Sequence, residues 1–211
     1  NWKKNNLGRG WVLGETLITG IGQGYTQTTP LQLCLMTAQI ANGGYKIKPK
    51  IIVNDDPLTL EDAKNLMELQ SLQKPNTRLF NDSKNIKIVQ EAMFSSTNEQ
   101  FGTSYRSRID DPKYQFAGKT GTAQVKRISK RERELDLKLE QIPYKDRDHA
   151  LYVAYGPYKN PRYALSIIVE HGGSGSKAAA PMAKELFKLI IDRDELCLLY
   201  TSPSPRDISR S

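Results

Sequence analysis

Lys119-Thr120-Gly121-Thr122-Ala123-Gln124 is the most informative stretch of the chain, and it lies between two short segments that read as β-structure. An extended peptide can add to such a strand through main-chain hydrogen bonds. Gly121 has no Cβ, so another backbone can approach it closely. The hydroxyls of Thr120 and Thr122 can bind a carboxylate, and Lys119 supplies a positive charge that attracts one. A main-chain N–H of the strand can also stabilise an oxyanion. The motif therefore predicts one wall of a binding cleft.

Length and composition indicate an ordinary globular domain. The chain has 211 residues, of which 38% are hydrophobic and 26% charged, which is enough for one domain with a core. It contains no apolar run of about 18 residues, so we expect no membrane span in it, and no signal peptide is visible. It begins Asn1-Trp2-Lys3-Lys4 without an initiator Met. We therefore expect a fragment, whose lack of an anchor says nothing about the parent protein.

The charge distribution and the cysteine content limit the classes of partner and ligand that we expect. The net charge is +8, but Lys and Arg are intermixed with Asp and Glu along the chain. No RNA-binding aromatic signature, zinc-finger spacing or basic zipper is present, so we expect no nucleic-acid partner. Cys34 lies in an apolar helical pattern and reads as a buried small hydrophobe. Without a C-x-x-C or His/Cys cluster, we expect no metal site and no cofactor.

Two helices are predicted in the first half of the chain, after residues 1–28, which read as loop with short extended pieces. The first helix has Thr29 as N-cap, Pro30 at its first position and Gln32 completing a capping box. The second is capped by Asp82 or Ser83 and should end near Ser95 to Asn98. The apolar faces are predicted to be Leu33, Leu35, Met36, Ala38 and Ile40 in the first helix, and Ile86, Val89, Ala92 and Met93 in the second.

The clearest β-signal comes late in the chain. Residues 150–155 and 162–170 are rich in Val, Ile, Tyr and Leu and are joined by a turn-rich linker, so an antiparallel hairpin is expected. A final helix should run to about Arg193, with Pro181 in its first turn. Its sheet-facing side is predicted to be Met182, Leu186, Leu189 and Ile190. The fold class is therefore α+β, an antiparallel sheet with flanking helices and a C-terminal helix packed on it.

Two segments stand apart from this core. Residues 126–149 are dense in charge, with a thin apolar stripe of Leu135, Leu139 and Ile142, and are interpreted as a partly helical, solvated arm rather than a binding patch. Residues 195–211 have no helical period and two Ser-Pro steps. They resemble translated sequencing-adapter read-through, and the alternative is a disordered C-terminal tail. Both interpretations leave residues 1–194 as the domain.

Several ordered sequence blocks stand out along the chain. They are Gly20–Tyr25, Thr29–Leu33, Ile40–Gly44, Gly118–Val125, Asp148–Leu151, Gly156–Pro161 and Glu170–Gly175. Together these blocks resemble one protein family, the class B penicillin-binding proteins. Over residues 1 to about 194 the chain is similar to the C-terminal part of their transpeptidase domain. The similarity is greatest to the cell-elongation type, penicillin-binding protein 2, rather than to the division-specific relative.

The resemblance implies a penicillin-binding, serine β-lactamase-like fold and D,D-transpeptidation of peptidoglycan stem peptides. In that reaction a serine attacks the D-Ala–D-Ala carbonyl, and an amine resolves the acyl-enzyme; β-lactams trap the serine. Lys119, Thr120, Gly121 and Thr122 would bind the substrate carboxylate and support the oxyanion. The parent protein would act in cell-wall synthesis and cell shape, at the periplasmic face of the bacterial inner membrane with an anchor upstream of this chain. An elongation-complex glycosyltransferase would be its partner.

The serine nucleophile is expected outside this chain. Ser71-Leu72-Gln73-Lys74 matches S-x-x-K, but it lies in a polar stretch without an apolar helix and too close to Lys119 for a helical subdomain between them. Ser96-Thr97-Asn98 matches S-x-N, but it lies at the end of the second predicted helix, where the family has no catalytic element. We therefore expect no catalytic residue here, a nucleophile upstream of Asn1, and an inactive fragment.

The sequence is also compatible with other functions. A β-lactamase or a β-lactam sensor would share the fold, and a non-catalytic scaffold domain would keep the strand without the serine. The two histidines could suggest acid–base chemistry. His149 begins one predicted strand and His171 follows the end of the other, so hydrogen-bonding structural roles are favoured for both.

Overall fold

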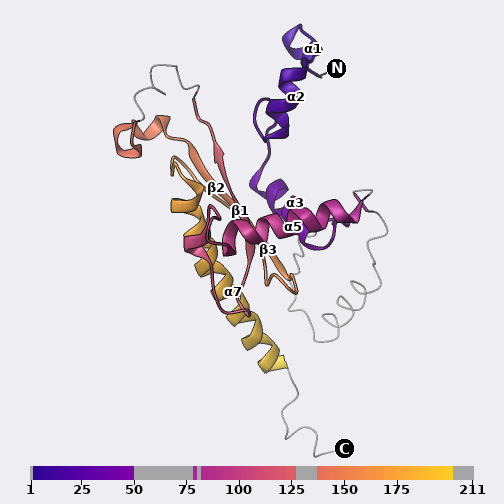
Figure 1. Cartoon of the computed structure of the whole chain (residues 1–211), viewed down its shortest axis with the longest axis vertical. Coiled ribbons are helices and arrows are strands. Elements are labelled where there is room, and N and C mark those ends of the chain that lie inside the picture. The colour runs from indigo at the N-terminus through magenta and orange to yellow at the C-terminus, as the bar shows by residue number, and fades with distance from the viewer. Residues whose placement is uncertain (1, 50–77, 80–81, 127–136, 202–211) are drawn as a thin grey trace, which may run out of the picture.

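The computed structural model describes residues 2–49, 78–79, 82–126 and 137–201 (Figure 1). Its helices and strands follow in chain order: α1 (Trp2–Leu7), α2 (Leu13–Gly20), α3 (Pro30–Ala41), α5 (Ser83–Asn98), η1 (Tyr105–Ser107), β1 (Ala117–Ala123), η2 (Leu139–Gln141), η3 (Tyr144–Asp146), β2 (His149–Gly156), β3 (Tyr163–Val169), η4 (Gly175–Ala179) and α7 (Ala180–Thr201).

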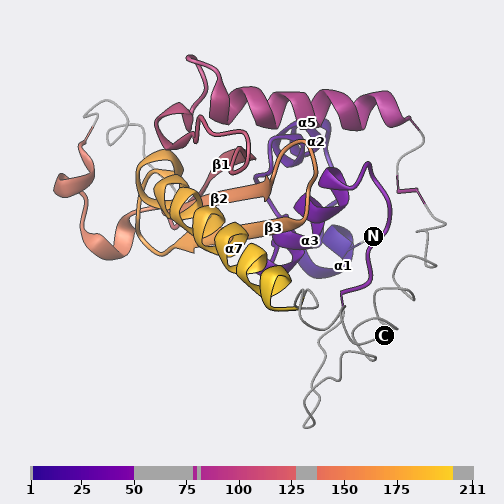
Figure 2. The same ribbon diagram turned by 90° about the horizontal axis from the view of Figure 1, so that it is seen from below.

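A three-stranded antiparallel sheet in the order β1-β2-β3 forms the centre, with β1 and β3 as its edges among the described residues. The register pairs Thr120 with Tyr152 and Tyr152 with Ile167, so the predicted hairpin of β2 and β3 is confirmed. Helix α7 lies across one face of the sheet, while α3 and α5 lie on the other side (Figure 2). The predicted α+β class, with a C-terminal helix packed on an antiparallel sheet, is confirmed.

Two apolar clusters fill the two sides of the sheet, because successive side chains of a strand point to opposite faces. Phe116, Tyr152 and Ala154 pack against Ala183, Phe187 and the other buried residues of α7. Ala117 and Tyr155 pack with Met93 of α5 on the other side, beside the half-buried Ile40 and Ala41 of α3. The central strand β2 therefore contributes to both cores.

The face of α7 that meets the sheet differs from the prediction. Met182, Leu186 and Leu189 are 49%, 40% and 67% exposed, so the predicted apolar face is wrong at these three positions, whereas Ile190 is half-buried. Ala180, Ala183, Phe187 and Ile191 are buried instead. The small side chains of Ala180 and Ala183 let the helix axis come close to the strands, with Phe187 and Ile191 filling the remaining space, and Met182, Leu186 and Leu189 lie on the outer side. The helix also continues to Thr201, beyond the predicted end near Arg193; residues 202–211 lie outside the described residues.

The ends of α3 and α5 agree with the prediction, and their faces agree in part. Thr29 Oγ1 accepts from Gln32 N–H and Gln32 Oε1 accepts from Thr29 N–H, which is the predicted capping box. Asp82 caps α5 by accepting from Lys84 N–H. The buried residues are Thr37 in α3 and Ile86, Met93 and Thr97 in α5, whereas Met36, Val89 and Ala92 are exposed.

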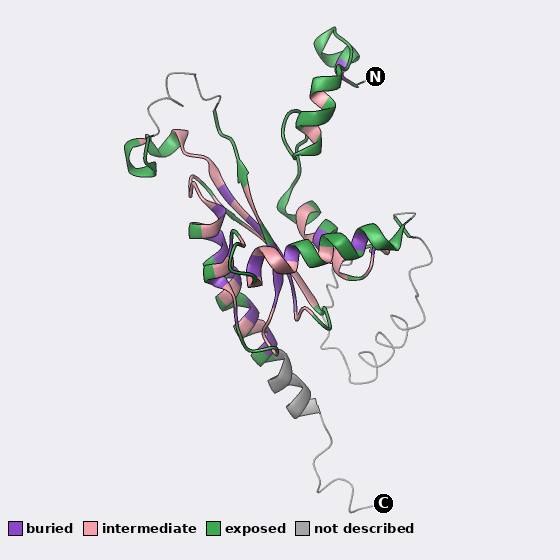
Figure 3. Ribbon diagram, in the orientation of Figure 1, coloured by how far each residue is buried: buried purple, intermediate pink, exposed green. Residues whose placement is uncertain are grey.

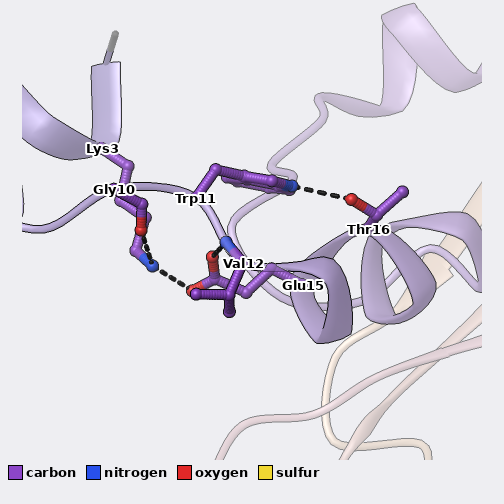
Figure 4. Close-up of polar contacts among 6 residues, drawn as sticks. All are labelled: Lys3, Gly10, Trp11, Val12, Glu15 and Thr16. Carbon is purple, nitrogen blue, oxygen red and sulfur yellow. Dashed lines mark hydrogen bonds and ion pairs between the residues drawn. The ribbon is translucent and has the colours of Figure 1, made fainter.

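Residues 1–28 contain two helices, so the prediction of a loop there is wrong. Glu15 explains the start of α2, because its carboxylate accepts from Val12 N–H at 2.9 Å and pairs with Lys3 (Figure 4). The ammonium of Lys3 also donates to Gly10 O at 2.8 Å. The hydrogen bond from Lys3 holds the pKa of Glu15 below its ordinary value. These helices lead away from the sheet and are mostly exposed (Figures 1 and 3).

Of the charged segment after β1, the structure describes Lys126 and residues 137–149. This segment forms two short 3-10 helices, η2 and η3, which agrees with a partly helical arm. Lys126 Nζ lies 3.2 Å from Asp146 Oδ2, so the two ends of the segment meet. Leu135, one member of the predicted apolar stripe, lies outside the described residues.

Candidate functional site

The Lys-Thr-Gly-Thr motif forms the outer half of edge strand β1. The strand pairs with β2 along its whole length, from Ala117 opposite Tyr155 to Ala123 opposite His149. Ala117 and Gly118 are buried, whereas Lys119 is exposed and Thr120 is half-buried. The chain therefore leaves the core at Gly118, and every residue of the motif has some exposure.

The last turn of α5 covers the inner half of this edge. Asn98 Nδ2 donates to Phe116 O at 2.9 Å, and Thr97 Oγ1 donates to Gly118 O at 3.4 Å. These carbonyls alternate along the strand and point away from β2. The next carbonyl in the series, Thr120 O, accepts only from the neighbouring Lys119 Nζ, at 2.9 Å, among the described residues. The covered edge therefore ends where the Lys-Thr-Gly-Thr motif begins.

Glycine is required next to the motif rather than only within it. A Cβ on Gly118 would lie 2.3 Å from Tyr152 Oη, and one on Gly175 would lie 2.4 Å from Leu151 O and 2.8 Å from Gly121 O. At Gly121 itself the nearest contact would be 3.3 Å, to Leu151 Cβ. Of these three glycines, Gly118 and Gly175, where η4 meets the sheet, therefore have the least room for a Cβ.

A buried hydroxyl cluster lies behind β1, and sequence reasoning missed it. Tyr152 Oη lies 2.9 Å from Thr97 Oγ1 and 3.1 Å from Ser104 Oγ, and the two smaller hydroxyls are 3.3 Å apart. All three residues are at most 1% exposed. Burial raises the pKa of Tyr152, and the hydrogen bonds to Ser104 and Thr97 partly oppose that shift. The cluster joins α5, the turn after it and β2 behind Gly118.

Of the two serine motifs, the structure describes only Ser96-Thr97-Asn98. Ser71-Leu72-Gln73-Lys74 lies outside the described residues. Ser96 Oγ lies 3.2 Å from Thr103 Oγ1, while Thr97 and Asn98 bond to the main chain of β1. The Ser96-Thr97-Asn98 motif therefore holds the strand in place, a role that was not predicted from the sequence.

The histidines form a structural pair at the far end of the sheet. His149 Nδ1 accepts from His171 N–H at 2.9 Å, and His171 Nδ1 donates to Arg147 O at 2.9 Å. The two ring centroids are 4.8 Å apart. His171 has a φ of 54°, so its backbone is in the left-handed region, where this bond holds it. These contacts agree with the structural roles predicted for both residues.

Among the described residues, no group of three or more His, Cys, Asp or Glu side chains could hold a metal ion. Within the same residues, no helix is both long and apolar enough to cross a lipid bilayer. The free thiol of Cys34 is half-buried and donates to Ala164 O at 3.3 Å, and burial raises its pKa.

Comparison with known proteins gives consistent results. The family described as penicillin binding protein transpeptidase domain matches residues 3–188. The peptidoglycan D,D-transpeptidase MrdA of Salmonella typhimurium (strain SL1344) is 32% identical over 191 residues, which are 90% of this chain and 29% of that protein. PBP2 of Pseudomonas aeruginosa, solved in complex with WCK 5153, aligns with a TM-score of 0.64 at 33% identity, over 89% of this chain and 36% of that one.

A second solved structure, the complex between PBP2 and MreC from Helicobacter pylori, aligns with a TM-score of 0.62 at 32% identity. It covers 89% of this chain and 30% of that one, so the chain spans under a third of these two relatives, MrdA and the Helicobacter PBP2. The resemblance drawn from the sequence blocks is confirmed, as is the fold it implied. The chain belongs to the family of penicillin binding protein transpeptidase domains.

Proposed function

We propose that this chain is the C-terminal part of a peptidoglycan D,D-transpeptidase and that the open half of β1 is one wall of its active site. The observation that carries the proposal is the exposed Lys119-Thr120-Gly121-Thr122 segment on a strand edge that α5 leaves free. A stem peptide can add there as a further strand, because Thr120 and Thr122 turn their main-chain groups away from β2. Its carboxylate would meet the ammonium of Lys119 and the hydroxyls of Thr120 and Thr122.

The chemistry divides between this chain and the part of the protein that carries the serine. The serine oxygen attacks the D-Ala–D-Ala carbonyl, the peptide C–N bond breaks, D-alanine leaves with a proton, and an acyl-enzyme remains. An amine from a neighbouring stem peptide then displaces the serine and forms the cross-link. This chain binds the carboxylate and offers a main-chain N–H of β1 to the oxyanion of each tetrahedral intermediate. A β-lactam carries a carboxylate and a reactive amide in the same relation, so it would bind the same wall.

The cellular location that we propose for the parent protein follows from its substrate. Peptidoglycan lies outside the cytoplasmic membrane, so we place the site at the periplasmic face of the inner membrane, with the anchor outside this chain. The relatives named MrdA and PBP2, and the Helicobacter pylori complex of PBP2 with MreC, support a role in elongation and cell shape. A glycosyltransferase that makes the glycan strands is the partner we propose, since cross-linking needs new strands.

Fluorescent penicillin labelling tests the proposal in a full-length protein that carries this chain. The wild-type protein should be acylated, and Lys119→Ala should lower the acylation rate about 10- to 100-fold, because a charge-assisted bond contributes about 1.5–3 kcal/mol. Lys119→Arg, which keeps the charge, is the matched control and should lose less. Acylation that is insensitive to Lys119→Ala would refute the role of β1.

Two further results would redirect the assignment. The 211-residue chain alone should not be labelled, and stoichiometric labelling at Ser71 would contradict an upstream nucleophile. A full-length protein that binds stem peptides but never forms an acyl-enzyme would be a scaffold of the same fold. Rapid deacylation after labelling would instead indicate a β-lactamase.

A further inference from the structure

The end of α5 holds β1 at three alternate residues, and the third contact is indirect. Asn98 and Thr97 bond directly to the carbonyls of Phe116 and Gly118. The preceding residue, Ser96, reaches β1 through another side chain. Its Oγ lies 3.2 Å from Thr103 Oγ1, which lies 3.2 Å from Thr120 Oγ1. A row of three hydroxyls therefore connects α5 to the Lys-Thr-Gly-Thr motif.

The turn that carries Thr103 is fixed on both sides. A Cβ on Gly102 would lie 2.3 Å from Ser96 O, so the turn packs directly against the end of α5. Ser104 N–H and Ser104 Oγ both donate to Ser96 O at 3.0 Å. Ser104 Oγ also joins the buried Tyr152 hydroxyl at 3.1 Å. Thr103 is exposed, but its backbone cannot move without breaking these buried contacts.

The number of hydrogen bonds that Thr120 can accept and donate determines which hydroxyl of this row donates to which. A threonine hydroxyl has two acceptor positions and one hydrogen to donate. Lys119 Nζ donates to Thr120 Oγ1 at 3.2 Å and occupies one acceptor position. When Ser96 donates to Thr103 and Thr103 donates to Thr120, both acceptor positions are filled. The hydrogen of Thr120 is then free to point toward the open edge, and each bond in the row strengthens the next.

We propose that Thr103 is a positioning residue that, backed by Ser96, aims the hydroxyl hydrogen of Thr120 at the carboxylate of the ligand. The inference rests on the proposed function for the carboxylate itself, but the orientation of Thr120 depends only on contacts within this chain. Thr103 touches neither the reacting atoms nor the ligand in this scheme. Its contribution is to exclude other rotamers of Thr120 and to polarise its hydroxyl.

A valine–serine pair of variants separates the hydroxyl of Thr103 from its shape. Thr103→Val keeps the branched shape without the hydroxyl, and Thr103→Ser keeps the hydroxyl without the methyl group. Both are made in the full-length protein, and the melting temperature of each variant is recorded, so that a folding defect is recognised. Acylation is then measured with benzylpenicillin and with its methyl ester, which lacks the carboxylate charge.

Thr103→Val should slow acylation by benzylpenicillin about tenfold, the size of one hydrogen bond to a charged group, and leave acylation by the methyl ester within about twofold. Thr103→Ser should retain the wild-type preference for the acid. Equal losses on acid and ester in Thr103→Val would overturn the proposal, because a general distortion of the site would affect both. A loss in Thr103→Ser as large as in Thr103→Val would overturn it as well.

A second readout does not depend on catalysis. Three-bond scalar couplings to the γ-methyl carbon of Thr120 report its χ1 rotamer in isotope-labelled protein. One rotamer is expected in the wild type and in Thr103→Ser, and a mixture in Thr103→Val. A single unchanged rotamer in Thr103→Val would refute the positioning role. If the wild type never forms an acyl-enzyme, the proposed function fails, while this measurement still decides whether Thr103 orients Thr120.

Discussion

Replacing Tyr152 by phenylalanine tests whether the buried hydroxyl cluster holds the sheet to α5. The change removes one oxygen, whose two partners are Thr97 Oγ1 at 2.9 Å and Ser104 Oγ at 3.1 Å. Those partners keep other bonds, since Ser104 Oγ donates to Ser96 O and Thr97 Oγ1 lies within 3.4 Å of Gly118 O. We therefore expect the free energy of unfolding to fall by about 1–2 kcal/mol, the net value of one to two buried hydrogen bonds.

Tyr155 supplies a matched control on the same strand. It is 1% exposed, like the fully buried Tyr152, but its hydroxyl is buried without a hydrogen-bond partner among the described residues. Burying an unpaired hydroxyl is unfavourable, so Tyr155→Phe should leave stability unchanged or raise it by up to about 1 kcal/mol. The same chemical change should thus lower stability at Tyr152 but not at Tyr155, three residues away.

Urea denaturation of both variants, followed by circular dichroism, measures the difference. For a chain of this size, about 1–2 kcal/mol corresponds to a decrease in melting temperature of roughly 2–8 °C, which calorimetry resolves. Equal unfolding free energies for the Tyr152→Phe and Tyr155→Phe variants would refute the reasoning. So would a larger loss at Tyr155, because the unpaired hydroxyl would then have a partner that stabilises the fold.

Three other outcomes are expected. Gly118→Ala should lower the free energy of unfolding by about 1–3 kcal/mol, because the added Cβ would lie 2.3 Å from Tyr152 Oη; an unchanged urea midpoint would contradict that contact. Phe187→Ala removes a fully buried ring and should cost about 3–5 kcal/mol, whereas Leu189→Ala should change stability by less than about 0.5 kcal/mol. Similar losses in the two variants would mean that another face of α7 meets the sheet. Burial raises the pKa of Tyr152 above 10.0, so its contribution to stability is complete below pH 10.0 and is lost as the pH rises through the folded-state pKa. Tyr152→Phe should weaken that alkaline loss without abolishing it, since the pKa of Tyr155 is raised as well; identical alkaline profiles would argue against the shift.

Helix ends were predictable where a few neighbouring residues determine them. The capping box of Thr29 and Gln32 and the cap by Asp82 are made between residues at most three positions apart, so the sequence displays them directly. The start of α2 was missed because Val12 has no side-chain acceptor. Its N–H donates to the carboxylate of Glu15, and Glu15 is held by Lys3 from another helix.

Helix faces were harder to predict, because two apolar rows can both have helical spacing. In α7, Met182, Leu186 and Leu189 form one row, while Ala183 and Phe187 belong to another. Burial of the larger residues is favoured when area alone is considered. The sheet selects the row with alanine, because β2 and β3 already present tyrosine, leucine and isoleucine side chains to that space.

The candidate site was also predictable only in part. The motif of Lys119 to Thr122 on an edge strand was visible in the sequence, since its residue types and its β-like flanks are local features. The cluster behind it was not visible, because Thr97 and Tyr152 are 55 positions apart, and the S-x-N match that contains Thr97 gives no sign of a contact with Tyr152. The only available signal was a tyrosine in β2 that needs a hydrogen-bond partner once it is buried.

The half-covered edge of β1 acts as a stop for any chain that pairs with it. Because α5 occupies the carbonyls of Phe116 and Gly118, an incoming strand can extend only along residues 120–123, which is about 13 Å of backbone. Such a short edge is long enough to pair with the end of a small peptide. It offers few main-chain hydrogen bonds to the edge of another sheet, so it limits edge-to-edge aggregation. It also prevents the ligand from slipping inward by two residues, and a peptide extended past that stop should therefore bind no more tightly than one that ends there.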